Sequence, residues 1–194
     1  MTLVEAILGD SWPARLLVTL FVACVYGGAI LLNNEILFPA LEFDRYRYLL
    51  FVPAGLKLLV IMLFGWRGVI GAGLGRAAVT LNEFPNLPMV DGLVFGASVA
   101  IAMWTGLALA SRLLRIGYPW PDLRWPHLLV IVVLASLFDA VAFNLAMVWI
   151  GHETLDPRLA SDMVKGFAGR VVGAFAFMLL ALDLKRRLLR TAAR

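Results

Sequence analysis

The sequence predicts an all-α fold, a polytopic bundle of six transmembrane helices that forms one membrane domain. Of the 194 residues, 62% are hydrophobic and only 15% are charged, whereas soluble domains carry about 25% charged residues. Apolar runs recur along the chain, and several reach the roughly 18 residues that a helix needs to cross the hydrocarbon layer. Breakers such as "NEFPNLPMVD" and "GYPWPDLRWP" separate these runs. Much of the apolar surface must therefore face lipid.

The apolar runs and their breakers define the expected elements in order. Membrane segments are predicted at about 14–36, 48–64, 65–81, 92–113, 127–150 and 164–184. Residues 1–12 are expected to lie in the membrane interface, since Trp12 suits the depth of the headgroups. Residues 185–194 are expected to form a basic cytoplasmic tail. The sequence shows no linker, no low-complexity stretch and no soluble domain, so 1–194 is predicted to be a single membrane domain.

Basic residues are distributed unevenly between alternate connections, and this predicts the orientation. One predicted side holds Arg15, Arg67, Arg112, Arg115, Arg124, Lys185, Arg186, Arg187, Arg190 and Arg194. The other holds Glu42, Asp44, Glu83, Asp91, Glu153, Asp156 and Asp162, with Arg45, Arg47, Arg158 and Lys165 as its basic residues. Short cytoplasmic loops are enriched in Lys and Arg. Both termini are therefore expected to be cytoplasmic.

Small residues spaced by four predict close contacts between helices, because they let two backbones approach and gain van der Waals contact. These residues are Ala23 and Gly27, Gly71 and Gly75, Gly92 and Gly96, and Gly169 and Gly173. Packing within the bundle is the main expectation. The Ala23–Gly27 pair is also a candidate contact with an oligomer or partner.

Two ionisable residues fall near the middle of apolar segments. Lys57 lies in "LFVPAGLKLLVIML" and Asp139 lies in "LASLFDAVAFNLAM". Such groups are costly in lipid and usually face the bundle interior, where they pair with one another. Their similar predicted depth and opposite sign predict a buried ion pair that fixes the register of two helices. A proton relay or a contact with a ligand remains the alternative.

A second polar group is predicted in the outer half of the bundle. Its members are Asn33, Asn34, Glu35, Arg76, Asn82, Glu83 and Arg170. Arginine presents a planar fork that suits carboxylates and phosphates. The group therefore predicts a polar vestibule for a small anionic ligand. Neutralisation of the two arginines by Glu35 and Glu83 is the alternative.

Catalysis, metal binding and nucleic-acid binding are not expected. His127 and His152 lack the helical spacing of a metal site, and neither lies clearly beside a candidate nucleophile. No cofactor is expected. The net charge of +4 arises between and after the apolar runs, so it does not form the basic patch of a nucleic-acid-binding fold.

The run "FVPAGLKLLVIMLFGWRGVIGAGLG" resembles the first family of bacterial membrane-associated sensor domains, which precede histidine kinase and diguanylate cyclase modules. There a proline-proline-alanine-glycine turn begins a helix, and a glycine–basic pair leads into a glycine-rich helix. The matching residues are Pro53, Ala54, Gly55, Gly65, Arg67 and Gly75. The stretch "LVFGASVAIAMWTGLALASRLLR" is similar to the next family helix, and the run with Gly169 and Gly173 to the last one. The resemblance covers about 48–190 and implies a sensor of the bacterial inner membrane.

Two departures from this family add positive charge to the interior. Arg170 stands where the family commonly has an acidic residue, and Lys57 stands where it has an apolar or small one. A family ligand site is therefore not expected to carry over unchanged. The sequence ends after the last apolar run without an output module, so a signal is expected to pass to a separate polypeptide.

The predicted topology is also similar to that of the substrate-binding S components of energy-coupling-factor transporters. In those proteins a small-residue face of the first helix contacts a membrane partner, a role open here to Ala23 and Gly27. That analogy rests on topology alone.

A non-catalytic sensory or accessory subunit is the first expectation for this chain. The alternatives are a solute-uptake component and a structural subunit of a larger membrane complex. Sensing or uptake requires Arg76 and Arg170 to be reachable by water and incompletely neutralised, whereas a structural role requires them to be paired.

Overall fold

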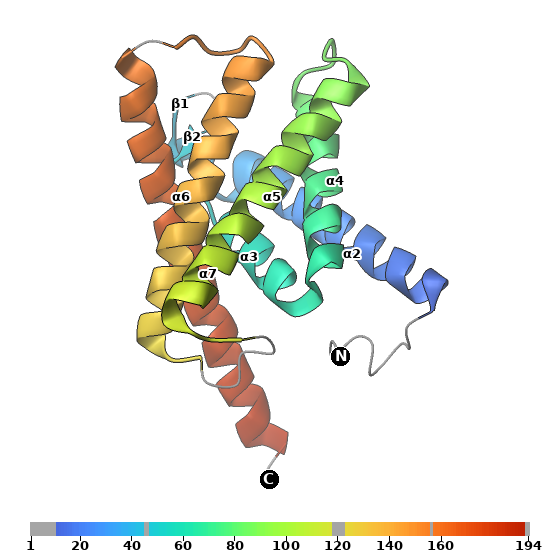
Figure 1. Ribbon diagram of the computed structural model, residues 1–194, viewed down its shortest axis with the longest axis vertical. Coiled ribbons are helices and arrows are strands. Elements are labelled where there is room, and N and C mark those ends of the chain that lie inside the picture. Colours follow the sequence, from blue (N-terminus) through green and yellow to red (C-terminus); the bar gives the residue numbers. More distant parts are fainter. Residues whose placement is uncertain (1–10, 45–46, 118–122, 156, 193–194) are drawn as a thin grey trace.

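The protein is an antiparallel helical bundle with one minimal β-ribbon (Figure 1). The computed structural model describes residues 11–44, 47–117, 123–155 and 157–192. The long helices of these ranges are α2 (Trp12–Leu31), α3 (Pro53–Phe64), α4 (Trp66–Glu83), α5 (Met89–Leu114), α6 (Trp125–Trp149) and α7 (Pro157–Ala192). The ribbon joins β1 (Glu42–Asp44) to β2 (Arg47–Tyr48). The predicted helical class is confirmed.

Four helices of the described residues are long and apolar enough to cross a membrane. They are α2 with its continuation to Leu37, α5, α6 and the Arg158–Ala181 part of α7. Helix α3 has 12 residues, which at about 1.5 Å per residue is well short of the roughly 30 Å hydrocarbon layer. Large apolar side chains such as Phe21 and Leu180 are exposed on the outside of the bundle. These features indicate a membrane protein with four span-length helices, fewer than the six spans expected.

Successive helices run in alternating directions, so their ends gather on two sides of the bundle. In Figure 1 the starts of α2, α4 and α6 lie in the lower half, as do the ends of α5 and α7. These are the helix ends beside the sequence's basic connections. Residues 1–10, which include most of the expected interfacial segment, lie outside the described residues.

Two helix starts differ from those expected. Helix α3 begins at Pro53, because residues 48–52 form the end of β2 and an irregular segment. Helix α7 begins at Pro157, seven residues before the expected start at Val164. Proline suits the first position of a helix, since its fixed φ is helical and its missing N–H is not needed there. Both helix starts are therefore set by a proline, which a pattern of apolar residues alone does not take into account.

The irregular segment 48–52 is packed directly on α7. A Cβ atom on Gly169 would overlap the Tyr48 carbonyl oxygen, and one on Gly173 would overlap that of Phe51. The Phe51 N–H also donates a hydrogen bond to the Gly169 carbonyl, with an N–O distance of 3.1 Å. Non-helical backbone at membrane depth needs such cover by protein. Gly169 and Gly173 thus contact an irregular segment, where a helix was expected.

The remaining glycine pairs bring α4 between α2 and α5. A Cβ atom on Gly75 would lie 2.5 Å from the Ala23 carbonyl oxygen of α2. One on Gly71 would lie 2.7 Å from the Thr19 carbonyl oxygen, and one on Gly96 of α5 would overlap that of Gly73. A Cβ on Gly92 would meet the Leu81 side chain at 2.6 Å, so this residue also faces α4.

The Ala23–Gly27 face is accordingly covered by α4 of the same chain. A Cβ on Gly27 would lie 3.3 Å from the Gly75 carbonyl oxygen. Packing within the chain therefore accounts for this pair, and the face is not open to a partner in this conformation.

Candidate functional site

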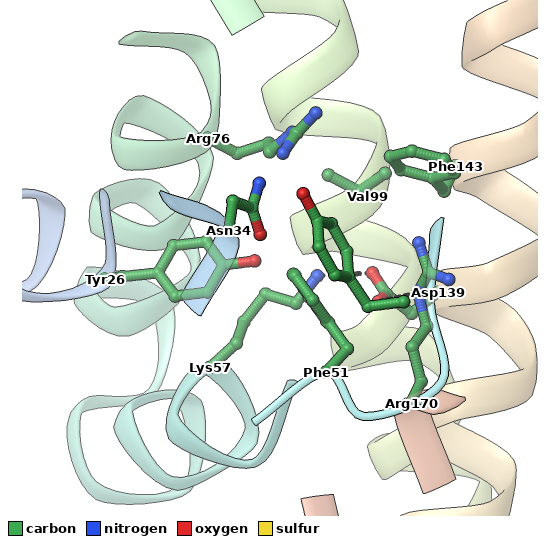
Figure 2. Close-up of a pocket in the computed structure, with 10 residues that line it drawn as sticks. Tyr26, Asn34, Phe51, Lys57, Arg76, Val99, Asp139, Phe143 and Arg170 are labelled. Atoms are coloured by element: carbon green, nitrogen blue, oxygen red, sulfur yellow. Dashed lines mark hydrogen bonds and ion pairs between the residues drawn. The ribbon is translucent and has the colours of Figure 1, made fainter. Parts of the chain in front are cut away.

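Three helices bring opposite charges together in the bundle interior. The Lys57 ammonium of α3 donates a hydrogen bond to Asp139 Oδ1 of α6, and Arg170 Nε of α7 donates to Asp139 Oδ2 at 3.0 Å (Figure 2). Each of the three residues is 5% exposed or less. We call Lys57, Asp139 and Arg170 the triad. The expected contact between Lys57 and Asp139 is present, and one carboxylate holds two cations.

Arg170 was expected in the outer vestibule, separate from the Lys57–Asp139 pair; it pairs with Asp139 and also lines one cavity with Asn34 and Arg76 of that vestibule. The predicted start of the last segment at 164 put Arg170 only six residues below the outer end. Arg170 actually lies 13 residues after Pro157, and Asp139 lies 10 residues before Trp149. The observed helix bounds thus give the two residues similar depth, and their pairing follows.

A second ion pair lies within α4. Arg76 Nη2 donates to Glu83 Oε2 at 3.0 Å, and the two side chains are 5% and 10% exposed. A spacing of seven residues is close to two helical turns, which places both side chains on one face. Burial raises the pKa of the Glu83 carboxyl, and the nearby Arg76 charge opposes that rise. Glu83 therefore neutralises Arg76, as the alternative interpretation proposed.

The other expected vestibule residues divide into two groups. Asn33 is buried, and its Oδ1 accepts a hydrogen bond from the Val52 N–H at 3.3 Å. Asn34 lines the cavity described below. Glu35 and Asn82 are exposed and line no part of it. Glu35 therefore does not neutralise a buried arginine. The remaining vestibule residues lie at two places, since Asn34, Arg76 and Arg170 line one small cavity, whereas Glu83 lines a separate pocket of about 440 Å³ between the α4–α5 connection and the end of α6.

Aromatic rings cover the faces of the cations. The Arg170 guanidinium carbon lies 4.6 Å from the Phe143 ring centroid, and that of Arg76 lies 5.5 Å from the same centroid. Lys57 Nζ lies 5.6 Å from the Tyr26 ring centroid. A cation close to a ring face is attracted by the ring quadrupole, by about 2 kcal/mol when desolvated. The rings thus offset part of the cost of burying these charges.

The triad and Arg76 border one small cavity. Its lining residues are Tyr26, Asn34, Tyr48, Phe51, Lys57, Arg76, Val99, Asp139, Phe143 and Arg170. The space open to the centre of a water-sized sphere is about 20 Å³, and about 10–15 Å³ suffices for one water. Figure 2 shows Arg76, Asn34, Tyr26 and Lys57 converging on this space from different elements.

The five ionisable residues Lys57, Arg76, Glu83, Asp139 and Arg170, here called the charge cluster, do not balance. With every group ionised, these residues supply three cations and two carboxylates, which leaves one buried positive charge. A third carboxylate, that of the exposed Glu42, acts on Glu83 and on Tyr48 of the cavity wall. In addition, Arg76 Nε is buried and has no hydrogen-bond partner within the described part of the chain. The site is thus equipped to attract an anion or a hydrogen-bond acceptor. No group of three His, Cys, Asp or Glu residues among the described ones could hold a metal.

The sequence interpretation missed the aromatic shell and the segment that carries Tyr48 and Phe51. Phenylalanine and tyrosine are common in apolar segments, so their presence gives no signal by itself. One signal was available: Phe143 follows Asp139 by four residues, which places both on the same helix face. Tyr26 and Phe51 approach the site only through the tertiary fold.

Comparison with known proteins adds no relative. No protein-family model, no curated protein and no solved structure matches this chain. The resemblance to membrane-associated sensor domains therefore stays an expectation that rests on the residues quoted for it.

Proposed function

We propose that this chain is a non-catalytic sensory or accessory subunit of the bacterial inner membrane, acting with a separate partner protein. One observation carries the proposal: α7 is a single helix of 36 residues that holds Arg170 in the charge cluster and continues to Ala192. Its last turns extend beyond the neighbouring helices in Figure 1. A change at the cluster would move or strain a rigid element that reaches the end of the bundle.

The proposed orientation has both termini in the cytoplasm. The basic residues of the tail, and those near the starts of α4 and α6, support it through the enrichment of Lys and Arg in cytoplasmic connections. In this orientation the protruding end of α7 is presented to cytoplasmic or membrane partners. The inner-membrane location and the sensory role are also what the sensor-domain resemblance implies.

Two features make the solute-uptake alternative less favoured. The cavity at the charge cluster, about 20 Å³, is far smaller than the roughly 300 Å³ or more of typical small-molecule pockets, and the pocket of about 440 Å³ beside Glu83 has acidic lining residues, Glu83 and Asp91, which do not suit an anion. The Ala23–Gly27 face, which would contact a coupling subunit in that alternative, is covered by α4.

A structural subunit remains the second candidate, because a specific observation favours it. Arg76 and Arg170 are both buried and each is ion-paired within the chain. A structural role requires such pairing. The unpartnered Nε of Arg76 and the unbalanced positive charge favour the sensory role.

Gentle isolation of the tagged protein from its native membrane, followed by mass spectrometry of everything that co-purifies, tests the proposal. We expect a kinase, cyclase or other signalling protein to co-purify. Reversal of two tail charges, Arg186→Glu with Arg187→Glu, should release it, and Arg158→Glu near the start of α7 is the matched control. Recovery of a large stoichiometric complex without a signalling protein would support the structural candidate, and transporter coupling subunits would support uptake.

A further inference from the structure

We propose that the cavity in the charge cluster is a binding site for one small monovalent anion of about the size of chloride. This inference rests on the proposed function, because it names the ligand class to which such a sensory subunit responds. Charge, hydrogen-bonding capacity and size each support it independently.

The charge imbalance calls for one negative charge. Asp139 is shared by Lys57 and Arg170, and Glu83 serves Arg76, so the cluster carries one more cation than carboxylate. Burying an uncompensated charge is costly, as is removal of one partner from a buried pair. The rings that cover the guanidinium faces offset this cost only in part. A single bound anion would make the cluster neutral.

Hydrogen-bonding capacity points to the same position. Arg76 is 4% exposed, and its Nη2 is engaged by Glu83 while its Nε has no partner among the described residues. Buried N–H groups in proteins nearly always have a partner, which is often an ordered water or an ion. Phe95 and Phe143 lie 5.2 and 5.5 Å from the Arg76 guanidinium carbon and occupy its faces. An acceptor must therefore approach the guanidinium edge. Tyr26 and Asn34 also line the cavity, and the Asn34 side chain is already engaged by Asn33 and Glu83.

The volume restricts the ligand. About 20 Å³ of space for water-sized centres admits one water or one ion of similar size. Halides fit this space, whereas sulfate, a lipid phosphate or a vitamin-sized carboxylate does not. A water could satisfy the Nε donor, but the buried positive charge would then be opposed only by Glu42, which is exposed and therefore screened by solvent. The structure therefore favours a small anion over both water and lipid.

The test uses the purified full chain in detergent, with gluconate replaced stepwise by chloride at constant ionic strength. Thermal unfolding is followed by the fluorescence of the six tryptophans. We expect chloride and bromide to raise the unfolding midpoint with saturation, and sulfate to have no such effect. An anion that binds the native state alone stabilises it in this way.

Two variants of the same ion pair should shift the anion affinity in opposite directions. Arg76→Gln removes the donor and the surplus charge while it retains an amide that can contact Glu83, so the affinity should fall about 10-fold or more. Glu83→Gln keeps an acceptor for Arg76 but removes a negative charge, so the affinity should rise by about the same factor. Lys165→Gln, which removes an exposed cation of α7, is the matched control and should not shift it.

The inference is overturned if the midpoint is independent of halide, or if both variants lose stability without any shift in anion dependence. Its failure can be told apart from failure of the proposed function. If a signalling partner co-purifies but the unfolding midpoint does not depend on halide, the anion site is refuted and the sensory role stands. If halide raises the unfolding midpoint but no signalling partner co-purifies, the sensory role is refuted and the anion site stands.

Discussion

The two buried ion-paired regions of this protein are built in different ways. The triad joins α3, α6 and α7 across 82 and 31 residues of sequence, and both oxygens of its one carboxylate are engaged. The Arg76–Glu83 pair joins two residues of α4 that are seven apart and leaves Arg76 Nε without a partner in the described part of the chain. The triad can therefore form only when three helices are assembled, whereas the pair can form within one helix.

This difference separates a structural from a responsive role. A saturated, long-range contact fixes the relative positions of helices, and loss of its carboxylate leaves two cations without a partner. A local pair contributes little to assembly, and its Arg76 lines the cavity and has a donor without a partner among the described residues. The triad is thus expected to control stability, and Arg76 to control binding.

Replacement of Asp139 should have the largest effect on stability. Asp139→Leu leaves the buried cations of Lys57 and Arg170 side by side without a carboxylate. The free energy of unfolding should therefore fall by about 5 kcal/mol, at the upper end of the costs for breaking a buried pair. Titration of the purified protein with denaturing detergent measures it. Because two cations share Asp139, Lys57→Met with Asp139→Leu should not restore stability, whereas the triple variant that adds Arg170→Met should. Full recovery in the double variant would contradict the triad.

Replacement of Gly169 should have the next largest effect, because it displaces the segment that closes the site. A side chain there would overlap the Tyr48 carbonyl oxygen, so Gly169→Val should cost about 3 kcal/mol by overpacking. Gly28→Ala is the control, since a Cβ at Gly28 meets nothing within 4 Å, and it should stabilise by about 0.5 kcal/mol. Equal effects of the two substitutions on the unfolding midpoint would show that segment 48–52 does not pack on α7.

Replacement of Lys57 should cost less than replacement of Asp139. In Lys57→Met, Asp139 and Arg170 remain as a neutral pair, and the loss is one hydrogen bond between charged groups, worth about 2 kcal/mol. The same denaturation series gives the comparison. If Lys57→Met proves as damaging as Asp139→Leu, Arg170 does not compensate Asp139, and the triad reduces to the pair that the sequence predicted.

Removal of the local pair should have the smallest effect on stability. Arg76→Met combined with Glu83→Leu replaces a buried pair by apolar side chains, which is often neutral or stabilising. We expect a change within about 1 kcal/mol, together with a weaker halide dependence, because the Arg76 donor is lost while the surplus charge of the triad remains. A cost close to that of Asp139→Leu would erase the distinction between the two regions.

Much of the fold could be predicted from the sequence, because the length of each apolar run and the composition of the turns indicate where helices lie. The positions of α5 and α6 follow closely from these signals. The start of α7 and the break before α3 could not be found in this way, since both depend on a proline at the first helical position. Six helices were expected and six are present among the described residues, but four of them reach span length and apolarity; α3, for example, has only 12 residues.

The site was predictable where depth and charge sign were sufficient. Lys57 and Asp139 have opposite charges and similar predicted depth, so their contact was expected. The contact of Arg170 with Asp139 was not expected, because the last helix was predicted to begin at residue 164 and this put Arg170 too close to the outer end. The enclosure of the site was not predictable. It depends on residues 48–52 lying against Gly169 and Gly173, a contact between distant segments for which the sequence has no periodic signal.

Diffraction from crystals grown in bromide, at a wavelength where bromide scatters anomalously, tests the central claim most directly. We expect one anomalous peak inside the cavity, within hydrogen-bonding distance of Arg76 Nε, and no such peak in Arg76→Gln crystals. Bromide peaks on the protein surface together with an empty or water-filled cavity would contradict it.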